Sequence, residues 1–122
     1  MKSVVVLGAS TNRAKFGNKA VRAFDQQGYE VFPVNPRATE IEGRVAFPEV
    51  TAVPVRPDIV SAYLPPAMLL RALPGIAGKG CGELWLNPGT DTAETIAEAE
   101  RLGLKVVCDC SLLRIGVSPA AF

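Results

Sequence analysis

The segment VLGASTNRAKFGN, residues 6–18, places a glycine, a serine and two cations directly after an apolar run. Gly8 permits a sharp backbone turn, and Ser10 offers a hydroxyl group. A helix that begins near Gly17 would point its unpaired N–H groups, and a partial positive charge of about 0.5, at this loop. The binding of an anion is the chemistry that this pattern favours.

The glycine spacing alone does not identify the ligand. Dinucleotide-binding domains carry the pattern G-x-G-x-x-G, whereas this chain has Gly8 and Gly17. An ordinary strand-to-helix turn would account for these two glycines equally well. Arg13, Lys15 and Asn18 in the same loop favour a phosphate ligand, although isolated lysines in loops are commonly only solvated.

The end of the second apolar run, VFPVNPR (residues 31–37), narrows the choice of ligand. NAD-binding domains place a carboxylate here to bind the ribose hydroxyls, whereas this chain has Asn35, Pro36 and Arg37. An arginine presents a planar fork suited to bidentate phosphate contacts. A ribose that carries a phosphate therefore fits better than NAD, which leaves NADP and coenzyme A open. An exposed arginine beside a proline-fixed turn is the purely structural alternative.

Histidine is absent from the chain, which removes the commonest general base and the commonest zinc ligand. The three cysteines, Cys81, Cys108 and Cys110, lack metal-like spacing, and we expect reduced thiols. Cys108 and Cys110 would face the same side of an extended strand, and packing in the core is favoured over a redox or metal role. No pairing of a nucleophile with a base is evident. The sequence therefore predicts no catalytic residue and no metal site.

The overall composition indicates a small globular protein. Its 122 residues fit one domain, residues 1–122, and 48% of them are apolar. The 13 basic and 12 acidic side chains nearly cancel, so nucleic acids and anionic membranes are not expected partners. The start of the chain lacks a signal-peptide core, and no run approaches the roughly 20 apolar residues of a membrane span. We expect a cytoplasmic location.

Five short apolar runs rich in β-forming residues alternate with helical patterns, which predicts repeated βαβ units. Such units require a parallel sheet with helices on both faces. The predicted fold class is α/β, a doubly wound, Rossmann-like sheet of about five strands, whose ligand would lie at the carboxyl ends of the strands. The predicted strands are Ser3–Leu7, Glu30–Val34, Asp58–Tyr63, Glu83–Leu86 and Leu104–Cys108.

Two helices follow the first and third predicted strands. The first is expected over Gly17–Gln27, with Gly28 as a left-handed stop. The second begins after Pro65-Pro66, since proline suits a first helical turn. Pro74-Gly75 interrupts its pattern, so we predict a short or kinked helix.

The third helix follows the fourth strand. Asp91 is predicted as its N-cap, with Glu94 three residues later in a capping-box arrangement and Gly103 at the end. The segment Arg37–Pro57 has no long helical pattern, so it is predicted to be a loop with a short strand or turn at Arg44–Phe47.

Four stretches together resemble the CoA-binding domain family: GAS…KFGN, YEVFPVNPR, a third strand that ends in a proline pair, and ELWLNPG. Small single-domain CoA-binding proteins of bacteria typify this family. The fold also resembles the N-terminal CoA-binding domain of the succinyl-CoA synthetase alpha subunit. The likeness spans nearly the whole chain, and V-N-P-R after a βα unit is its most specific part.

This resemblance implies that coenzyme A, or an acyl-CoA, is the ligand. In the family the first glycine loop cradles the phosphates, the basic residue after the second strand meets the ribose 3′-phosphate, and the apolar-Pro-Pro turn packs against apolar parts of the ligand. The implied cofactor-binding residues are Gly8, Ala9, Ser10, Lys15, Phe16, Gly17, Asn18, Asn35, Pro36, Arg37, Leu64, Pro65 and Pro66.

The chain departs from the family pattern in two places. The phosphohistidine of the synthetase has no counterpart here, because the chain has no histidine. The fifth strand ends CDCSLLRIG, where relatives tend to have a Met-Asp-Arg-Cys type of ending.

The sequence leaves three possible functions open. The leading one is a CoA-binding module without catalysis of its own. The second is an NADP-dependent oxidoreductase or redox sensor, for which Tyr63 is the one candidate proton donor. The third is a nucleotide-sensing regulatory subunit or interaction module whose pocket is vestigial.

Overall fold

A computed structural model describes every residue, Met1–Phe122, and its centre is a parallel sheet of five strands in the order β2-β1-β5-β6-β7. This confirms the predicted fold class. The first, second and fourth strands match their predicted bounds, and the other two are shorter than predicted. The strands are β1 (Ser3–Leu7), β2 (Glu30–Val34), β5 (Ile59–Ala62), β6 (Glu83–Leu86) and β7 (Val106–Cys108).

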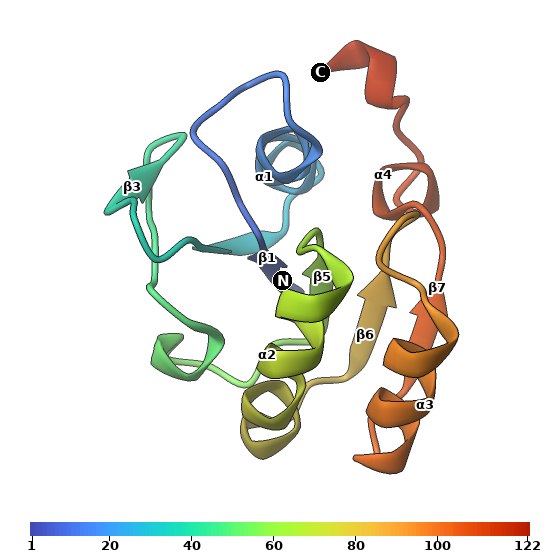
Figure 1. Cartoon of the computed structure of the whole chain (residues 1–122). Helices are drawn as coiled ribbons and strands as arrows, with labels where there is room; N and C mark the ends of the chain where they lie inside the picture. The colour runs from blue at the N-terminus through green and yellow to red at the C-terminus, as the bar shows by residue number, and fades with distance from the viewer.

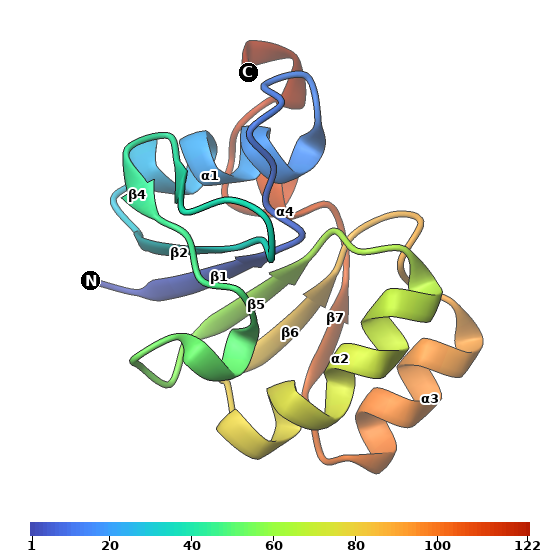
Figure 2. The same cartoon turned by 60° about the vertical axis from the view of Figure 1, so that its left-hand side comes forward.

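The strand order reverses between β1 and β5. The chain leaves β1, adds β2 on one side, and then returns to place β5 on the other side of β1. Figure 2 shows the arrowheads of β1, β5, β6 and β7 pointing to one edge of the sheet. In open parallel sheets a ligand binds outside the carboxyl ends of the strands, beside such a reversal.

Helices cover both faces of the sheet, as predicted. One face carries α1 (Phe16–Gln26) and α4 (Ser111–Arg114), and the other carries α2 (Pro66–Lys79) and α3 (Ala93–Arg101) (Figures 1 and 2). Because side chains alternate along a strand, β1 contributes to two separate cores. Val4 and Val6 pack with Val21 and Phe24 of α1, whereas Val5 and Leu7 pack with Leu69 and Leu73 of α2.

The prediction of a short or kinked second helix was wrong about its length. Helix α2 runs for 14 residues, Pro66–Lys79, and passes through Pro74. A proline inside a helix costs roughly 3 kcal/mol locally. This helix also buries Leu69, Leu73 and Ile76 against the sheet, and such tertiary packing outweighs the local cost. No helix in the structure is both long and apolar enough to cross a bilayer.

The predicted N-cap of the third helix was wrong by one residue. Thr92 caps α3, because its side-chain oxygen accepts a hydrogen bond from the Thr95 N–H at 3.1 Å. Asp91 instead accepts from the Gly89 N–H at 3.3 Å and so belongs to the preceding turn. Both Asp and Thr can cap a helix, and the tertiary path of the β6–α3 turn selects between them.

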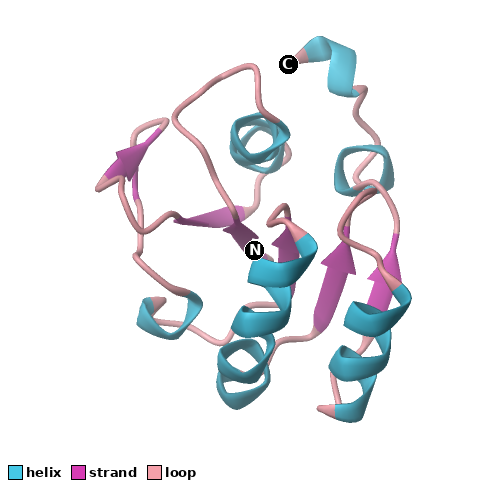
Figure 3. Ribbon diagram, viewed as in Figure 1, coloured by secondary structure: helices cyan, strands magenta, loops and turns pink.

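The segment after β2 has no long helix, as predicted. It forms a small hairpin of β3 (Glu40–Ile41) and β4 (Arg44–Val45), followed by the short 3-10 helix η1 (Val50–Ala52). Figure 3 shows this segment beside the β2 edge of the sheet. Helix α4 and the 3-10 helix η2 (Pro119–Ala121) were not predicted, since helices of four residues or fewer carry little periodic signal.

Candidate functional site

A cleft of about 1180 Å³ runs along the carboxyl edge of the sheet. Its walls come from the loops after all five strands, from α2 and from the η1 segment. Of the 13 predicted cofactor-binding residues, 11 line this cleft, and Asn18 and Pro66 do not. The 11 are Gly8, Ala9, Ser10, Lys15, Phe16, Gly17, Asn35, Pro36, Arg37, Leu64 and Pro65.

The two glycines of the first loop are required by close backbone contacts. Gly8 has a φ of +88°, and a Cβ on it would lie 3.0 Å from the carbonyl carbon of Tyr63. A Cβ on Gly17 would lie only 2.2 Å from the carbonyl oxygen of Gly8. The start of α1 therefore packs directly against the end of β1, which brings the first turn of this helix to the floor of the cleft.

Several backbone N–H groups around this loop have no acceptor within the chain. They belong to Ser10 and Thr11 in the loop and to Phe16 and Gly17 in the first turn of α1. The N-terminus of a helix also carries a partial positive charge. Lys15, just before the helix, forms no ion pair. Free N–H groups and a cation beside a helix N-terminus are the kind of groups that bind anions.

Asn18 supports the loop from behind and does not reach the cleft. It is fully buried, and its Nδ2 donates to the carbonyl oxygen of Ser10 at 2.9 Å and to Glu42 Oε2 at 3.1 Å. Glu42 also forms an ion pair with Arg13 at 3.2 Å. The structure thus gives Asn18 and Arg13 partners inside the protein, and Lys15 is the loop cation that faces the cleft.

The side chain of Asn35 links the loop after β1 to the loop after β2 by hydrogen bonds. Its Nδ2 donates to the carbonyl oxygen of Ala9 at 2.9 Å, and its Oδ1 accepts from the Arg37 N–H at 2.7 Å. The side chain therefore builds the turn that presents Arg37. The guanidinium of Arg37 is exposed at the cleft and has no hydrogen bond or ion pair in the chain.

Apolar side chains flank the cleft. Leu64 and Pro65 line it, while Pro66 starts α2. Phe16 and Met68 are 49% and 44% exposed, and both line the cleft. A ligand with apolar or aromatic portions would cover them.

At the β6 and β7 end of the cleft the polar groups bond to each other. Asn87 Nδ2 donates to the carbonyl oxygen of Ala62 at 2.9 Å, and Asn87 Oδ1 accepts from the Ser111 N–H at 2.8 Å. The hydroxyl groups of Ser61 and Ser111 lie 2.8 Å apart. These bonds explain the burial of Asn87 without a ligand.

Tyr63 is poorly suited to proton transfer. Its hydroxyl group is buried and forms no hydrogen bond. Burial raises the pKa of Tyr63 to about 12. A general acid works best with a pKa near the working pH, so this side chain does not supply the proton donor that an oxidoreductase would need.

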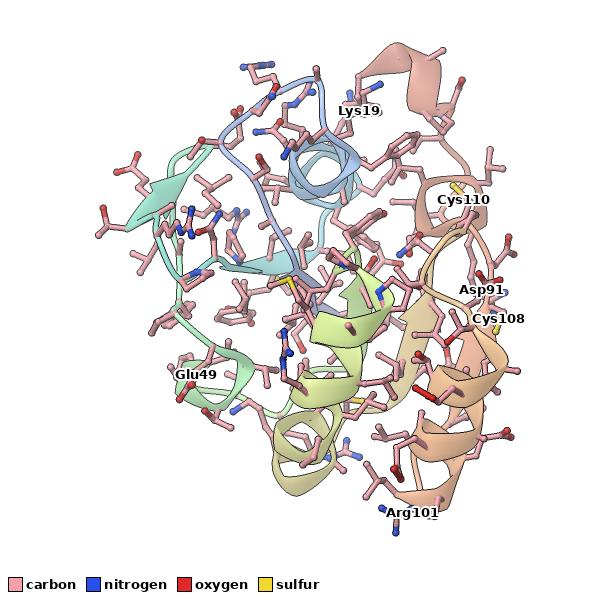
Figure 4. The ribbon with its side chains drawn as sticks, viewed as in Figure 1. Lys19, Glu49, Asp91, Arg101, Cys108 and Cys110 are labelled. Carbon is pink, nitrogen blue, oxygen red and sulfur yellow. The ribbon has the colours of Figure 1, made fainter.

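The cysteine prediction was partly wrong. Cys108 is exposed as the last residue of the edge strand β7, while Cys81 and Cys110 are partly buried. Because β7 ends at Cys108, Cys110 is not on the same strand, and Figure 4 shows the two side chains at separate places. Cys110 precedes α4 and lines the cleft.

The cleft residues on α2 and η1 were not predicted from the sequence. Met68, Arg71, Ala72 and Gly75 line the cleft from α2. Their spacing of i, i+3, i+4 and i+7 places them on one helical face. The apolar residues Leu69, Leu73 and Ile76 define the buried face of α2. The residues on the opposite, exposed face could therefore have been identified from the same spacing in the sequence.

Comparison with known proteins agrees with this geometry. The family model described as "CoA binding domain" matches residues 2–116. The chain belongs to this CoA-binding domain family. The expected resemblance is thereby confirmed, and the glycine loop, Arg37 and the Leu64-Pro65 turn all lie within the matched residues.

Solved structures of small proteins share the whole fold. A conserved hypothetical protein from Pyrococcus furiosus superposes with a TM-score of 0.86 at 29% identity, covering 93% of this chain and 99% of that chain. A protein from Thermus thermophilus gives a TM-score of 0.85 at 30% identity, with 93% and 87% coverage. Each superposition covers most of both chains, so these two proteins share the whole fold with this chain.

Curated relatives contain the domain as a small part of larger proteins. An ADP-forming acetate–CoA ligase of Archaeoglobus fulgidus is 28% identical over 116 residues, which are 87% of this chain and 17% of the ligase. The alpha subunit of a second such ligase, from Pyrococcus furiosus, is 25% identical, with 87% of this chain and 26% of the subunit covered. The chain therefore spans about a fifth of the length of these curated relatives.

Proposed function

We propose that this CoA-binding domain binds coenzyme A, or an acyl-CoA, in the cleft and does not catalyse a reaction by itself. The observation that carries the proposal is the pair of anion-binding positions in the cleft. One consists of Lys15 with the free N–H groups of the α1 terminus, and the other is the unpaired guanidinium of Arg37. We assign the pyrophosphate to the first position and the ribose 3′-phosphate to the second.

The dimensions of the cleft support an elongated ligand. Its walls include residues that follow each of the five strands. Neighbouring strands lie about 4.8 Å apart, so the edge from β2 to β7 extends roughly 19 Å. Coenzyme A is long, carries two separated anionic groups, and has an aromatic base that Phe16 and Met68 can cover. The membership of the chain in the CoA-binding domain family and the CoA ligases among its relatives support the same ligand.

The oxidoreductase alternative fits less well. An arginine in the position of Arg37 also suits the 2′-phosphate of NADP. However, the only proton donor proposed for that chemistry was Tyr63, whose hydroxyl group is buried and whose pKa is raised to about 12. NADP is therefore included among the ligands in the titration below.

Isothermal titration calorimetry with coenzyme A, dephospho-CoA, NADP and NAD tests the proposal. We expect micromolar affinity for coenzyme A and at least tenfold weaker binding of dephospho-CoA, since a charge-assisted hydrogen bond contributes about 1.5–3 kcal/mol. The Arg37→Ala variant should bind coenzyme A more weakly than the wild type does and should bind dephospho-CoA with unchanged affinity. Tighter binding of NADP than of coenzyme A would refute the assignment of the ligand.

Arg101→Ala is the matched control. Arg101 pairs with Glu98 at the end of α3, remote from the cleft (Figure 4). This substitution removes the same charge from the protein but should leave all four affinities unchanged. An equal loss of affinity in both arginine variants would mean that net charge, rather than a contact from Arg37, controls binding.

A further inference from the structure

Arg37 and Arg71 differ from every other arginine in the chain. The other six, Arg13, Arg22, Arg44, Arg56, Arg101 and Arg114, each donate a side-chain hydrogen bond or form an ion pair within the protein. The guanidinium groups of Arg37 and Arg71 do neither, and both side chains line the cleft. An arginine without a partner at a cleft is available to a ligand carboxylate or phosphate.

The path of the chain brings these two arginines to the same end of the cleft. The Asn35 N–H donates to the carbonyl oxygen of Phe47 at 2.9 Å, which holds the start of the η1 segment beside the Arg37 turn. On its other side η1 packs against α2, where a Cβ on Gly75 would lie 3.4 Å from Thr51 Cγ2. Arg71 lies one helical turn before Gly75. The η1 segment is therefore flanked by Arg37 and Arg71.

The charge of the cleft also favours an anion at this end. Its lining includes the cations Lys15, Arg37 and Arg71, and Glu49 is the only acidic residue. Glu49 lies on the η1 side (Figure 4), and its Oε1 accepts a hydrogen bond from the Thr51 hydroxyl at 2.8 Å. Because Lys15 belongs to the first anion position, Arg37 and Arg71 together with Glu49 leave one net positive charge at this end, which favours an anionic group.

Arg71 approaches the cleft from the face of the sheet opposite to the first anion position. Lys15 and the free N–H groups belong to the start of α1, whereas Arg71 belongs to α2 on the other face (Figure 1). The pyrophosphate position therefore has its own donors, whereas Arg71 lies on the helix that packs against the η1 segment, and this segment also borders the Arg37 turn.

We propose that Arg71 is a second recognition residue for the ribose 3′-phosphate and acts together with Arg37 on that one group. The inference rests on the proposed function, because it assumes that coenzyme A occupies the cleft. It adds a contact from α2, and it makes discrimination between coenzyme A and dephospho-CoA depend on two side chains from opposite walls.

Calorimetry with coenzyme A and dephospho-CoA on Arg71→Ala, Arg37→Ala and the double variant tests this inference. We expect Arg71→Ala to weaken binding of coenzyme A about tenfold and to leave dephospho-CoA unchanged. The double variant should bind both ligands equally, with a loss smaller than the product of the two single losses, because both arginines act on one phosphate. Arg71→Lys should recover only part of the affinity, since a lysine lacks the planar fork.

Two results separate failure of this inference from failure of the proposed function. If wild-type protein binds coenzyme A and Arg37→Ala abolishes discrimination while Arg71→Ala does not change it, the role of Arg71 is wrong and the proposed function stands. If Arg71→Ala weakens both ligands equally, Arg71 does not read the 3′-phosphate. Wild-type protein that binds neither ligand removes the proposed function and this inference together.

Melting temperatures control for a structural effect. Arg71 is exposed and has no intramolecular partner, so its replacement should not change stability. Arg101→Ala serves again as the charge-matched variant. A lowered melting temperature for Arg71→Ala, with equal losses for both ligands, would assign Arg71 a structural role.

Discussion

The two halves of the carboxyl edge of the sheet use their polar groups in opposite ways. At the β1 and β2 half, backbone N–H groups of the α1 terminus and the side chains of Lys15 and Arg37 have no partner inside the protein. At the half formed by β5, β6 and β7, the side chains of Asn87, Ser61 and Ser111 bond to one another, and the Tyr63 hydroxyl group is the one buried side-chain group without a partner. Unsatisfied polar groups beside a cleft indicate a place for a ligand, whereas satisfied ones indicate a rigid wall.

The largest effect should come from the backbone contact on which the first half depends. Gly17→Ala would push a Cβ to 2.2 Å from the Gly8 carbonyl oxygen. We expect a loss of about 3 kcal/mol in the free energy of unfolding, and a melting temperature lower by roughly 12 °C or more. Binding of coenzyme A by the remaining folded protein should be lost, because the first turn of α1 must move.

Gly78→Ala is the control for this substitution. Gly78 lies in α2, and a Cβ there would meet no atom within 4 Å. Alanine is favoured over glycine in a helix by up to about 1 kcal/mol, so this variant should be at least as stable as the wild type. Equal melting temperatures for both alanine variants would contradict the account of the loop.

The second-largest effect is expected at the half of the carboxyl edge that contains β6 and β7. Asn87→Ala removes the partners of the Ser111 N–H and the Ala62 carbonyl oxygen, which are buried. We expect a loss of about 2–3 kcal/mol of stability, measured by urea unfolding, with the affinity for coenzyme A changed less than about threefold. The opposite outcome, unchanged stability with tenfold weaker binding, would make Asn87 a ligand-binding residue and end the contrast between the two halves.

Lys15→Ala should show the reverse pattern, at a smaller magnitude. Lys15 is exposed and has no ion pair, so its removal should leave the melting temperature unchanged. We expect roughly fivefold weaker binding of both coenzyme A and dephospho-CoA, with a weaker dependence of affinity on salt. The matched control is Lys105→Ala, because Lys105 pairs with Glu83 at 3.2 Å and does not line the cleft.

The smallest effect is expected at the amino edge of the sheet, where polar groups are again satisfied internally. The Ser3 backbone N–H donates to Asp58 Oδ2 at 2.8 Å and holds the pKa of that carboxyl below its ordinary value of 3.8. The ionised carboxylate therefore stabilises the fold above pH 3.8, and this contribution is lost as the pH falls through the lowered pKa.

Asp58→Asn should reduce stability at pH 7 by less than about 1 kcal/mol, because the carboxylate is exposed to solvent. The difference between the variant and the wild type should narrow as the pH is lowered toward 3, as measured by urea unfolding at each pH. A difference that stays constant over this range would mean that ionisation of Asp58 does not contribute.

Much of the fold could be predicted from local patterns. The strands Ser3–Leu7, Glu30–Val34 and Glu83–Leu86 were predicted at their observed bounds, because continuous apolar runs between turn residues are a property of neighbouring positions. The exceptions had tertiary causes. Pro74 was predicted to interrupt α2, but the burial of residues around it maintains the helix, and Cys108 is exposed because β7 is an edge strand.

The sequence by itself determined the alternation of strands and helices, the glycine loop that ends β1 and the cation that follows β2, since each depends on residues a few positions apart. Only the tertiary structure decided which polar side chains are free. Asn18 is bonded to Glu42, 24 residues away, and Asn35 to Ala9, 26 residues away, whereas Arg71 has no partner and lines the same cleft as Arg37. A hydrogen bond depends on distance in space, and the folded chain brings together groups that the order of residues keeps apart.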